Sequence, residues 1–433
     1  MDQAVFAKRR TELMQMIDNG VAVITTAPEQ IRNGDVHYRY RPDSDFFYLS
    51  GFEEPEAVMV LIPGRVQGEY ILFCREKDPD REQWNGYRTG LEGAISEYGA
   101  DDAFPIDDID DILPGLMENR DRVYCVMGRY AEFDSHLIHW YNEVRSLSSK
   151  GFHAPAGLVD AGHILNEMRL IKTGNEIRSM RRAAQVSTEA HMRAMRACQP
   201  GMHEFQVEAE LEYGFRLGGS HYPAYPSIVA GGANACVLHY VENRDILRDG
   251  DLLLIDAGAE IDYYAADVTR TFPVNGRFSP AQREVYEIVL QAQFDAIDAC
   301  VIGNTWNDPH EAAVRTLCQG LIDLGLLVGT IDEVIESGGY RKFYMHKTGH
   351  WLGMDVHDVG DYKVEDQWRE LENGMTLTVE PGLYIGADDS IDKRFHNIGI
   401  RIEDDVLITA RGADVLTRKL PKTIDDIEAL MNS

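Results

Sequence analysis

Five residues of metal-ligating type stand in otherwise apolar or glycine-rich segments of the second half of this chain. They are Asp256 in LLLID, Asp267 in YYAADVTRTF, His350 in MHKTGHWLG, Glu380 in MTLTVEPGLY and Glu403 in IGIRIEDDVLI. Strand-like surroundings would bury these side chains, and a buried carboxylate without a counter-charge costs on the order of several kcal/mol or takes up a proton. Two divalent cations among them would let the four acids stay ionised and the imidazole stay neutral.

The donor set indicates which metal such a site prefers. Oxygen ligands with a single nitrogen suit hard or borderline ions, so we expect Mn²⁺, with Zn²⁺, Co²⁺ or Fe²⁺ as compatible alternatives. A lone Asp at the end of a strand is more often a cap or a turn residue. The prediction of a metal site therefore depends on the combination of the five residues.

The length of 433 residues predicts two domains, each large enough to bury its own core. Residues 1–172 alternate strand-like runs with helical stretches, which indicates an α/β domain. The runs are VAVITT at 21–26, AVMVLI at 57–62, YILFC at 70–74 and VYCVM at 123–127. Thr173 and Glu176 then have the spacing of a capping box in front of a long amphipathic helix. Residues 173–433 are predicted to form a mixed α+β catalytic domain.

Within the second domain, DLLLIDAGAEIDYYAADVTRTF predicts two adjoining strands joined by a bend around Ile261 and Asp262. If these strands pair, Asp256 and Asp267 can face one another across the ladder. Two further strand-like segments, MTLTVEPGLYI and GIGIRIEDDVLIT, carry Glu380 and Glu403.

Composition excludes some partners. The formal net charge of −30 argues against nucleic acid, since phosphate binding needs a basic surface. No apolar run approaches the roughly 20 residues that a membrane-spanning helix needs, and the charged start MDQAVFAKRR does not resemble a signal peptide. We therefore expect a cytoplasmic protein that does not bind membranes. Adaptation to salt and compositional drift both remain explanations of the acidic charge.

Five motifs occur in one order along the chain: IDAG, AADVTRTFPVNG, HWLGMDVHDVG, VEPGLY and GIRIEDD. Together they resemble the pita-bread metallopeptidases and, within that superfamily, the bacterial Xaa-Pro aminopeptidases, or aminopeptidases P. The resemblance covers nearly the whole chain, starting at YRYRPDSDFFYLSGFEEPEAV. It implies an α/β N-terminal domain followed by an α+β catalytic domain of the pita-bread (creatinase/aminopeptidase-like) fold.

The resemblance also implies an activity, the removal of the first residue from peptides that have proline at the second position. Asp267 and Glu403 would bridge two divalent ions, Asp256 would complete one site, and His350 with Glu380 would complete the other. A hydroxide bridging the ions would attack the scissile carbonyl. Glu380 would exchange a proton with it, first as a base and then as an acid toward the departing amine.

Further residues acquire roles from the same resemblance. His239 and His357 match positions that line the active site and can hydrogen-bond the substrate carbonyl, whereas a structural role is the ordinary interpretation of an isolated histidine. His346 is expected in the pocket. Arg401 and Tyr384 are expected to support the ligands or to bind substrate.

Trp84, in REQWNGYR, matches a residue that a neighbouring subunit contributes to the proline pocket in the resembled family. The match implies an oligomer, expected to be a homotetramer, with a dimer as the alternative. The competing interpretation of Trp84 is a tryptophan that packs in the core of its own domain.

Two other functions compete with this prediction. A prolidase, or a related organophosphate-cleaving enzyme, would share the fold and all five ligands but act on dipeptides. Tryptophan after His350, where prolidases usually have proline, favours the aminopeptidase. A non-catalytic interaction protein with the same fold would have lost its ligands, and all five are present here.

Overall fold

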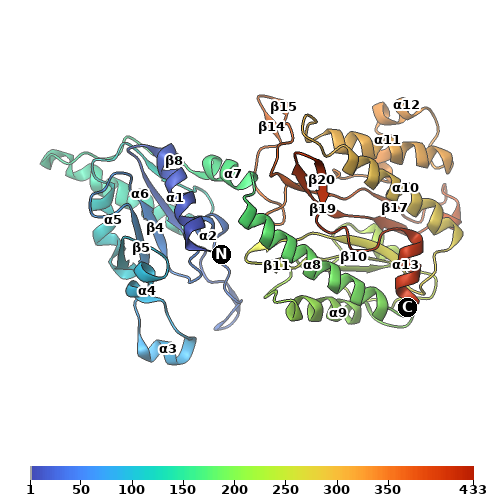
Figure 1. Cartoon of the computed structure of the whole chain (residues 1–433), viewed down its shortest axis with the longest axis horizontal. Helices are drawn as coiled ribbons and strands as arrows, with labels where there is room; N and C mark the ends of the chain where they lie inside the picture. Colours follow the sequence, from blue (N-terminus) through green and yellow to red (C-terminus); the bar gives the residue numbers. More distant parts are fainter. Residues whose placement is uncertain (1) are drawn as a thin grey trace. The chain divides into compact units, whose positions relative to one another are not determined.

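The computed structural model describes residues 2–433, and the chain divides into two compact units, one ending at Met168 and the other running from Arg169 to Ser433 (Figure 1). Each unit has its own cluster of buried apolar side chains. The division falls close to the boundary predicted near Thr173.

The first unit contains a six-stranded mixed sheet in the order β6-β5-β4-β1-β7-β8. Its strands are β1 (Val21–Thr25), β4 (Val58–Leu61), β5 (Tyr70–Cys74), β6 (Asp102–Pro105), β7 (Val123–Cys125) and β8 (Leu158–Asp160). Its helices are α1 (Gln3–Ile17), α2 (Ser44–Ser50), α3 (Pro79–Asn85), α4 (Gly90–Ser96), α5 (Ile109–Met117) and α6 (Ala131–Ser146), and α7 (Gly162–Leu170) follows. A small hairpin pairs β2 (Ile31–Asn33) with β3 (Val36–His37). All four strand-like runs predicted from the sequence form strands of this sheet, which confirms the α/β architecture.

The second unit combines several small antiparallel sheets with helices. Its strands are β9 (Ile228–Gly231), β10 (Leu252–Asp256), β11 (Glu260–Ile261), β12 (Tyr264–Ala265), β13 (Thr269–Pro273), β14 (Lys363–Val364), β15 (Gln367–Trp368), β16 (Thr376–Val379), β17 (Gly382–Ile385), β18 (Ile398–Arg401), β19 (Asp404–Thr409) and β20 (Gly412–Val415). Two three-stranded sheets have the orders β13-β10-β9 and β16-β19-β20, and β17 pairs with β18. This mixture confirms the predicted α+β class.

Long helices complete the second unit. They are α8 (Gly174–Ala197), α9 (Glu204–Leu217), α10 (Pro280–Asp298), α11 (Asp308–Asp323), α12 (Ile331–Ser337) and α13 (Ile424–Met431). In Figure 1, α8 packs against α9 and α10 packs against α11. Helix α8 begins with the predicted capping box, in which the Glu176 carboxylate accepts a hydrogen bond from the Thr173 backbone N–H at 2.8 Å.

The segment between Asp256 and Asp267 differs from the prediction in detail. Strands β10 and β13 pair as expected, but Asp256 lies opposite Thr269. The bend lies at its predicted place, but it is the turn of a separate β11–β12 hairpin that was not predicted, with Asp262 and Tyr263 in the left-handed region at φ 51° and 65°. Two consecutive residues with positive φ make the tight turn whose twist suits a two-residue hairpin.

The register of the other strand pairs brings two acids together. Val379 lies opposite Asp404 in the β16–β19 pair, and Gly382 lies opposite Arg401 in the β17–β18 pair. Glu380 and Glu403 occupy the gaps between these paired segments and therefore emerge at the same interruption of the ladder.

Among the described residues, no helix combines the length and the apolar character needed to cross a lipid bilayer.

Candidate active site

A cleft of about 260 Å³ in the second unit brings all five metal-type residues together. Asp256 and Asp267 come from the end of the β10–β13 pair, and Glu380 and Glu403 come from the interruption between the β16–β19 and β17–β18 pairs. A loop supplies His350. The other residues of the predicted site that line this cleft are His239, His346, His357 and Arg401.

Asp256 ends β10 and Asp267 precedes β13, and the two carboxylates approach a common phenol. The Tyr225 hydroxyl lies 2.6 Å from Asp256 Oδ1 and 2.5 Å from Asp267 Oδ1. Burial, together with the charges of both acids, raises the pKa of Tyr225 well above its ordinary value, so the phenol stays protonated. One hydroxyl proton serves one acceptor at a time, so the pair of carboxylates retains unused acceptor capacity.

His350 is held with one ring nitrogen toward the acids. Its Nδ1–H donates to the carbonyl of Trp351 at 2.9 Å, which leaves Nε2 at 3.2 Å from Asp267 Oδ2 and 3.7 Å from Glu380 Oε1. This is the orientation of a metal-binding imidazole, whose second nitrogen donates to a backbone carbonyl. Burial alone would lower the pKa of His350, but the hydrogen bond and charge of Asp267, with Glu380, raise it to about 9.

A glycine permits this placement. A Cβ atom on Gly349 would lie 2.0 Å from the carbonyl oxygen of Thr378, so only glycine lets the chain approach β16 this closely. The His350 N–H then donates to Thr378 Oγ1 at 3.1 Å.

Glu403 is a buried acid and Glu380 a partly buried one, and both have few positive neighbours. Glu403 accepts a hydrogen bond from Thr269 Oγ1 at 2.6 Å. Burial, followed by the charges of Asp267 and Glu380, raises the pKa of Glu403 well above its ordinary value. Burial raises the pKa of Glu380 to about 7, although His350 and Arg401 oppose that shift.

Arg401 is the guanidinium of the site and links several of its parts. Its Nη2 donates to Asp256 Oδ2 at 2.6 Å, and its Nη1 donates to the Tyr384 hydroxyl at 2.9 Å. The Tyr384 hydroxyl lies 2.9 Å from His346 Nε2, to which it can donate its proton. Burial lowers the pKa of His346 to about 4, so this ring is a neutral acceptor. Arg401 thus orients Asp256 directly and His346 through Tyr384.

His239 and His357 lie on the lining with exposed side chains, and the His357 ring stands 4.4 Å from that of His350 at 78°. Trp84 belongs to α3 of the first unit and is 86% exposed. The interpretation of Trp84 as a core residue of its own domain is therefore wrong.

Sequence reasoning missed three supporting residues. They are Tyr225, Thr269, whose hydroxyl accepts from Arg401 Nε at 3.1 Å, and Asp405, whose Oδ1 accepts from the Asp267 N–H at 3.1 Å. Strand alternation could have revealed Asp405, because it lies two residues after Glu403 and so on the same face. No local pattern singles out Tyr225.

The donor set fits divalent cations. Ligand atoms of Asp267, His350 and Glu403 all lie within 4.8 Å of one another. The four carboxylates face one guanidinium, Arg401, and the protein does not supply enough positive charge to keep them all ionised. Bound cations would supply that charge.

Comparison with known proteins agrees with this geometry. Residues 178–410 match the model of metallopeptidase family M24, and residues 6–124 match the aminopeptidase P N-terminal domain. The chain is 44% identical to the Xaa-Pro aminopeptidase of Haemophilus influenzae, covering 99% of this chain and 97% of that protein. It is also 44% identical to that of Escherichia coli, covering 98% and 97%. The solved structure of Pseudomonas aeruginosa aminopeptidase PepP superposes with a TM-score of 0.99 at 56% identity, covering 100% of this chain and 98% of that one.

The chain belongs to metallopeptidase family M24 and, with its N-terminal domain, to the aminopeptidase P group. It is a peptidase, and the predicted fold class is confirmed.

Proposed function

We propose that this protein removes the first residue from peptides with proline at the second position. The observation that carries the proposal is the cluster of four carboxylates, three of them buried, and one oriented imidazole around a cleft. The names of its full-length relatives, Xaa-Pro aminopeptidases, support the same activity.

We further propose that two divalent cations, Mn²⁺ in the first place, are held by Asp256, Asp267, His350, Glu380 and Glu403, with Asp267 and Glu403 as the bridging ligands. Bound cations would polarise the scissile carbonyl and lower the pKa of a water molecule. The raised pKa values of Glu403 and Asp256 in the chain alone support a requirement for added positive charge.

The remaining roles belong to side chains of the cleft. Glu380 would accept a proton from the attacking water and deliver it to the departing proline nitrogen. His357 and His239 would donate hydrogen bonds to the substrate carbonyl oxygen as negative charge develops there. Their exposed positions on the lining support direct contact with the peptide.

Trp84 is proposed to stack on the proline ring of a substrate bound by a neighbouring subunit. A tryptophan that is 86% exposed on its own unit is available for such a contact. A homotetramer, or a dimer, and a cytoplasmic location remain predictions.

The experiment that tests the activity compares an Xaa-Pro-Xaa tripeptide with an Xaa-Pro dipeptide on the Mn²⁺-loaded protein. We expect the tripeptide to be cleaved with the higher kcat/KM. A preference for the dipeptide would identify a prolidase and contradict the proposal.

A further inference from the structure

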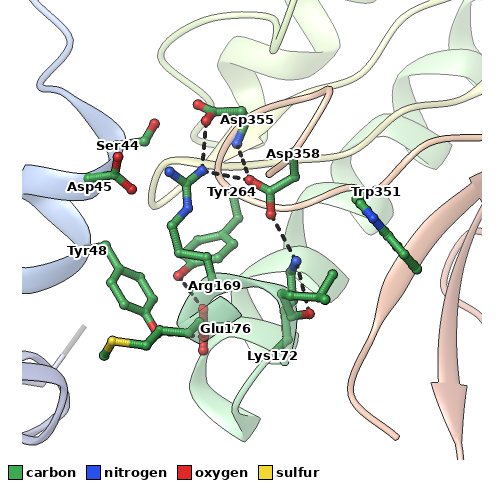
Figure 2. Close-up of polar contacts among 12 residues, drawn as sticks. Ser44, Asp45, Tyr48, Arg169, Lys172, Glu176, Tyr264, Trp351, Asp355 and Asp358 are labelled. Carbon is green, nitrogen blue, oxygen red and sulfur yellow. Dashed lines mark hydrogen bonds and ion pairs between the residues drawn. The ribbon is translucent and has the colours of Figure 1, made fainter. Parts of the chain in front are cut away.

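Three buried charged side chains form a cluster beside the loop that carries His357 (Figure 2). Arg169 Nη2 donates to Asp358 Oδ1 at 2.6 Å, and Lys172 Nζ donates to Asp358 Oδ2 at 2.9 Å. The side chains of Arg169, Lys172 and Asp358 are each only 1% exposed. Arg169 also donates to Asp355 Oδ2 at 2.7 Å, so two cations meet two carboxylates.

The cluster joins parts of the chain that are distant in sequence. Asp358 lies 189 residues after Arg169 and 186 after Lys172. Arg169 stands near the end of α7, Lys172 follows that helix, and Asp358 ends the segment that begins at His350. The ion pairs therefore anchor one end of the segment His350–Asp358 to the region that leads into α8.

The loop itself is closed by backbone contacts around this carboxylate. The Asp358 N–H donates to the carbonyl of Trp351 at 2.9 Å, and the Ala265 N–H donates to the carbonyl of Gly353 at 2.8 Å. A Cβ atom on Gly353 would lie 2.0 Å from Asp358 Oδ2, so the loop wraps tightly around the anchored side chain. Residues 351–358 consequently form one compact loop that folds around the Asp358 side chain.

The position of His357 depends on this loop. Among residues 2–433, no side chain or backbone group hydrogen-bonds to the His357 ring, whereas His350 and His346 are each held through their ring nitrogens. The backbone of the loop and the edge contact with the His350 ring, at 4.4 Å, therefore set where the His357 ring stands. Asp358 is its immediate neighbour in that loop.

Stability alone is a weak reason for such a cluster, because apolar side chains of similar volume usually stabilise a core at least as well as a buried ion pair. Ion pairs with fixed hydrogen-bond directions do provide a defined geometry. A catalytic donor displaced by about 1 Å can lose on the order of a hundredfold in rate.

We propose that Arg169, Lys172 and Asp358 are positioning residues, which hold the loop so that the His357 ring reaches the substrate carbonyl. The inference rests on the role of His357 in the proposed function. The three charged residues would affect turnover only through the position of His357. None of the three lines the cleft that holds His357.

The test uses the full-length, Mn²⁺-loaded protein and the tripeptide substrate. Lys172→Met and Asp358→Asn should each lower kcat about 10- to 100-fold, with KM changing less than about twofold and metal content unchanged. The kcat of the double variant should be no lower than that of Asp358→Asn, because Lys172 acts through the carboxylate that is already lost. The double variant removes one cation together with the carboxylate, and Arg169 keeps its contact with Asp355, so this variant can be measured even if one single variant folds poorly.

The decisive experiment combines Asp358→Asn with His357→Ala in one protein. We expect Asp358→Asn to have no further effect on kcat there. A further loss of similar size in that background, or an unchanged kcat in the folded single variants, would overturn the proposal. If His357→Ala itself kept full activity, the proposed role of His357 would fail, which is a distinguishable result.

Two controls separate positioning from general destabilisation. Ser279→Ala removes the N-cap of α10, where Ser279 Oγ accepts from the Gln282 N–H at 3.3 Å. It should lower the unfolding temperature without changing kcat at low temperature. Asp332→Asn makes the same chemical change as Asp358→Asn in an exposed ion pair with Arg315 and should leave both properties unchanged. A fall in kcat in the Ser279→Ala control equal to that of Asp358→Asn would count against positioning.

Discussion

Glu403 and Asp404 are neighbours in sequence, both almost fully buried, and their surroundings are opposite in charge. The Asp404 carboxylate is surrounded by donors at 2.6–2.8 Å, from Thr417 Oγ1, Gln293 Nε2, Arg270 Nη2 and Lys422 Nζ. Burial would raise the pKa of Asp404, but Arg270 and Lys422 hold it well below its ordinary value. Glu403 faces Asp267 and Glu380, and its pKa is raised.

The difference separates a structural acid, Asp404, from a proposed metal ligand, Glu403. The chain itself compensates Asp404, so this carboxylate can remain ionised without any added group. It does not compensate Glu403 and its neighbouring acids, which therefore need positive charge from outside the chain. Burial of an acid does not reveal its role; the charges around it do.

The largest expected effect is the loss of all activity on removing the metal. Chelation should abolish hydrolysis of the tripeptide, and Mn²⁺ should restore it, because the acid cluster requires cations to work. Elemental analysis of the treated protein provides the control. Full activity in a preparation shown to be free of metal would contradict the prediction.

Glu403→Ala and Asp404→Ala should affect different properties, metal binding in the first variant and stability in the second. Glu403→Ala, like Asp267→Ala, should lose metal together with at least about a thousandfold in kcat/KM, since metal catalysis contributes several kcal/mol. Its metal-free stability should change little, because the raised pKa favours the uncharged carboxyl and the change removes no ion pair among residues 2–433. Asp404→Ala should cost about 3–5 kcal/mol in the free energy of unfolding, because Arg270 and Lys422 lose their buried partner. Urea unfolding and metal analysis measure both, and equal stability losses in the two metal-free variants would refute the distinction.

His357→Ala should retain its metal content but lose about 10²- to 10⁴-fold in kcat, because the proposed donor to the reacting carbonyl is lost while no proposed ligand is touched. Metal content and steady-state kinetics on one preparation measure this. A metal-free His357→Ala protein would make His357 a ligand rather than a donor.

The pH dependence of stability should also differ between the two kinds of acid. In metal-free protein, the pKa of Glu380 is raised to about 7 and that of His350 to about 9, so the folded state binds more protons than the unfolded state below those values. Stability should therefore rise as the pH falls from 9 to about 6. The lowered pKa of Asp404 acts with the opposite sign, so its contribution should be lost as the pH falls below about 4. Urea unfolding across this range measures both trends, and a metal-free stability that falls between pH 9 and 6 would contradict the first.

The sequence predicted much of the site because each of the four acids and the imidazole carries a local signature, such as an apolar strand ending at Asp256. Period-two alternation also implies that Glu403 and Asp404 face opposite sides. It does not indicate which side holds Arg270 and Lys422, because those contacts come from distant segments. The anchoring of Asp358 by Arg169 was missed for the same reason, since 189 residues separate them.

Trp84 is an apolar side chain that its own unit does not bury. In this it is like Glu403, an acid that the chain does not neutralise. Trp140 is the matched control, since it is 2% exposed in the core of the same unit and donates to Asp110 at 2.7 Å. Trp84→Ala should weaken tripeptide cleavage by about 1 kcal/mol, or several-fold in kcat/KM, with metal content and fold unchanged. Trp140→Ala should instead cost about 3–5 kcal/mol in the free energy of unfolding.

The oligomeric state provides a second test of the proposed contact of Trp84 with a neighbouring subunit. If Trp84 completes a proline pocket on a neighbouring subunit, light scattering should detect an oligomer, and dilution that dissociates it should lower activity by no less than Trp84→Ala does. Trp84→Ala should then have no further effect on the dissociated enzyme, because the stacking partner has already gone. A fully active monomer would contradict the shared pocket, and the exposed tryptophan would need another partner.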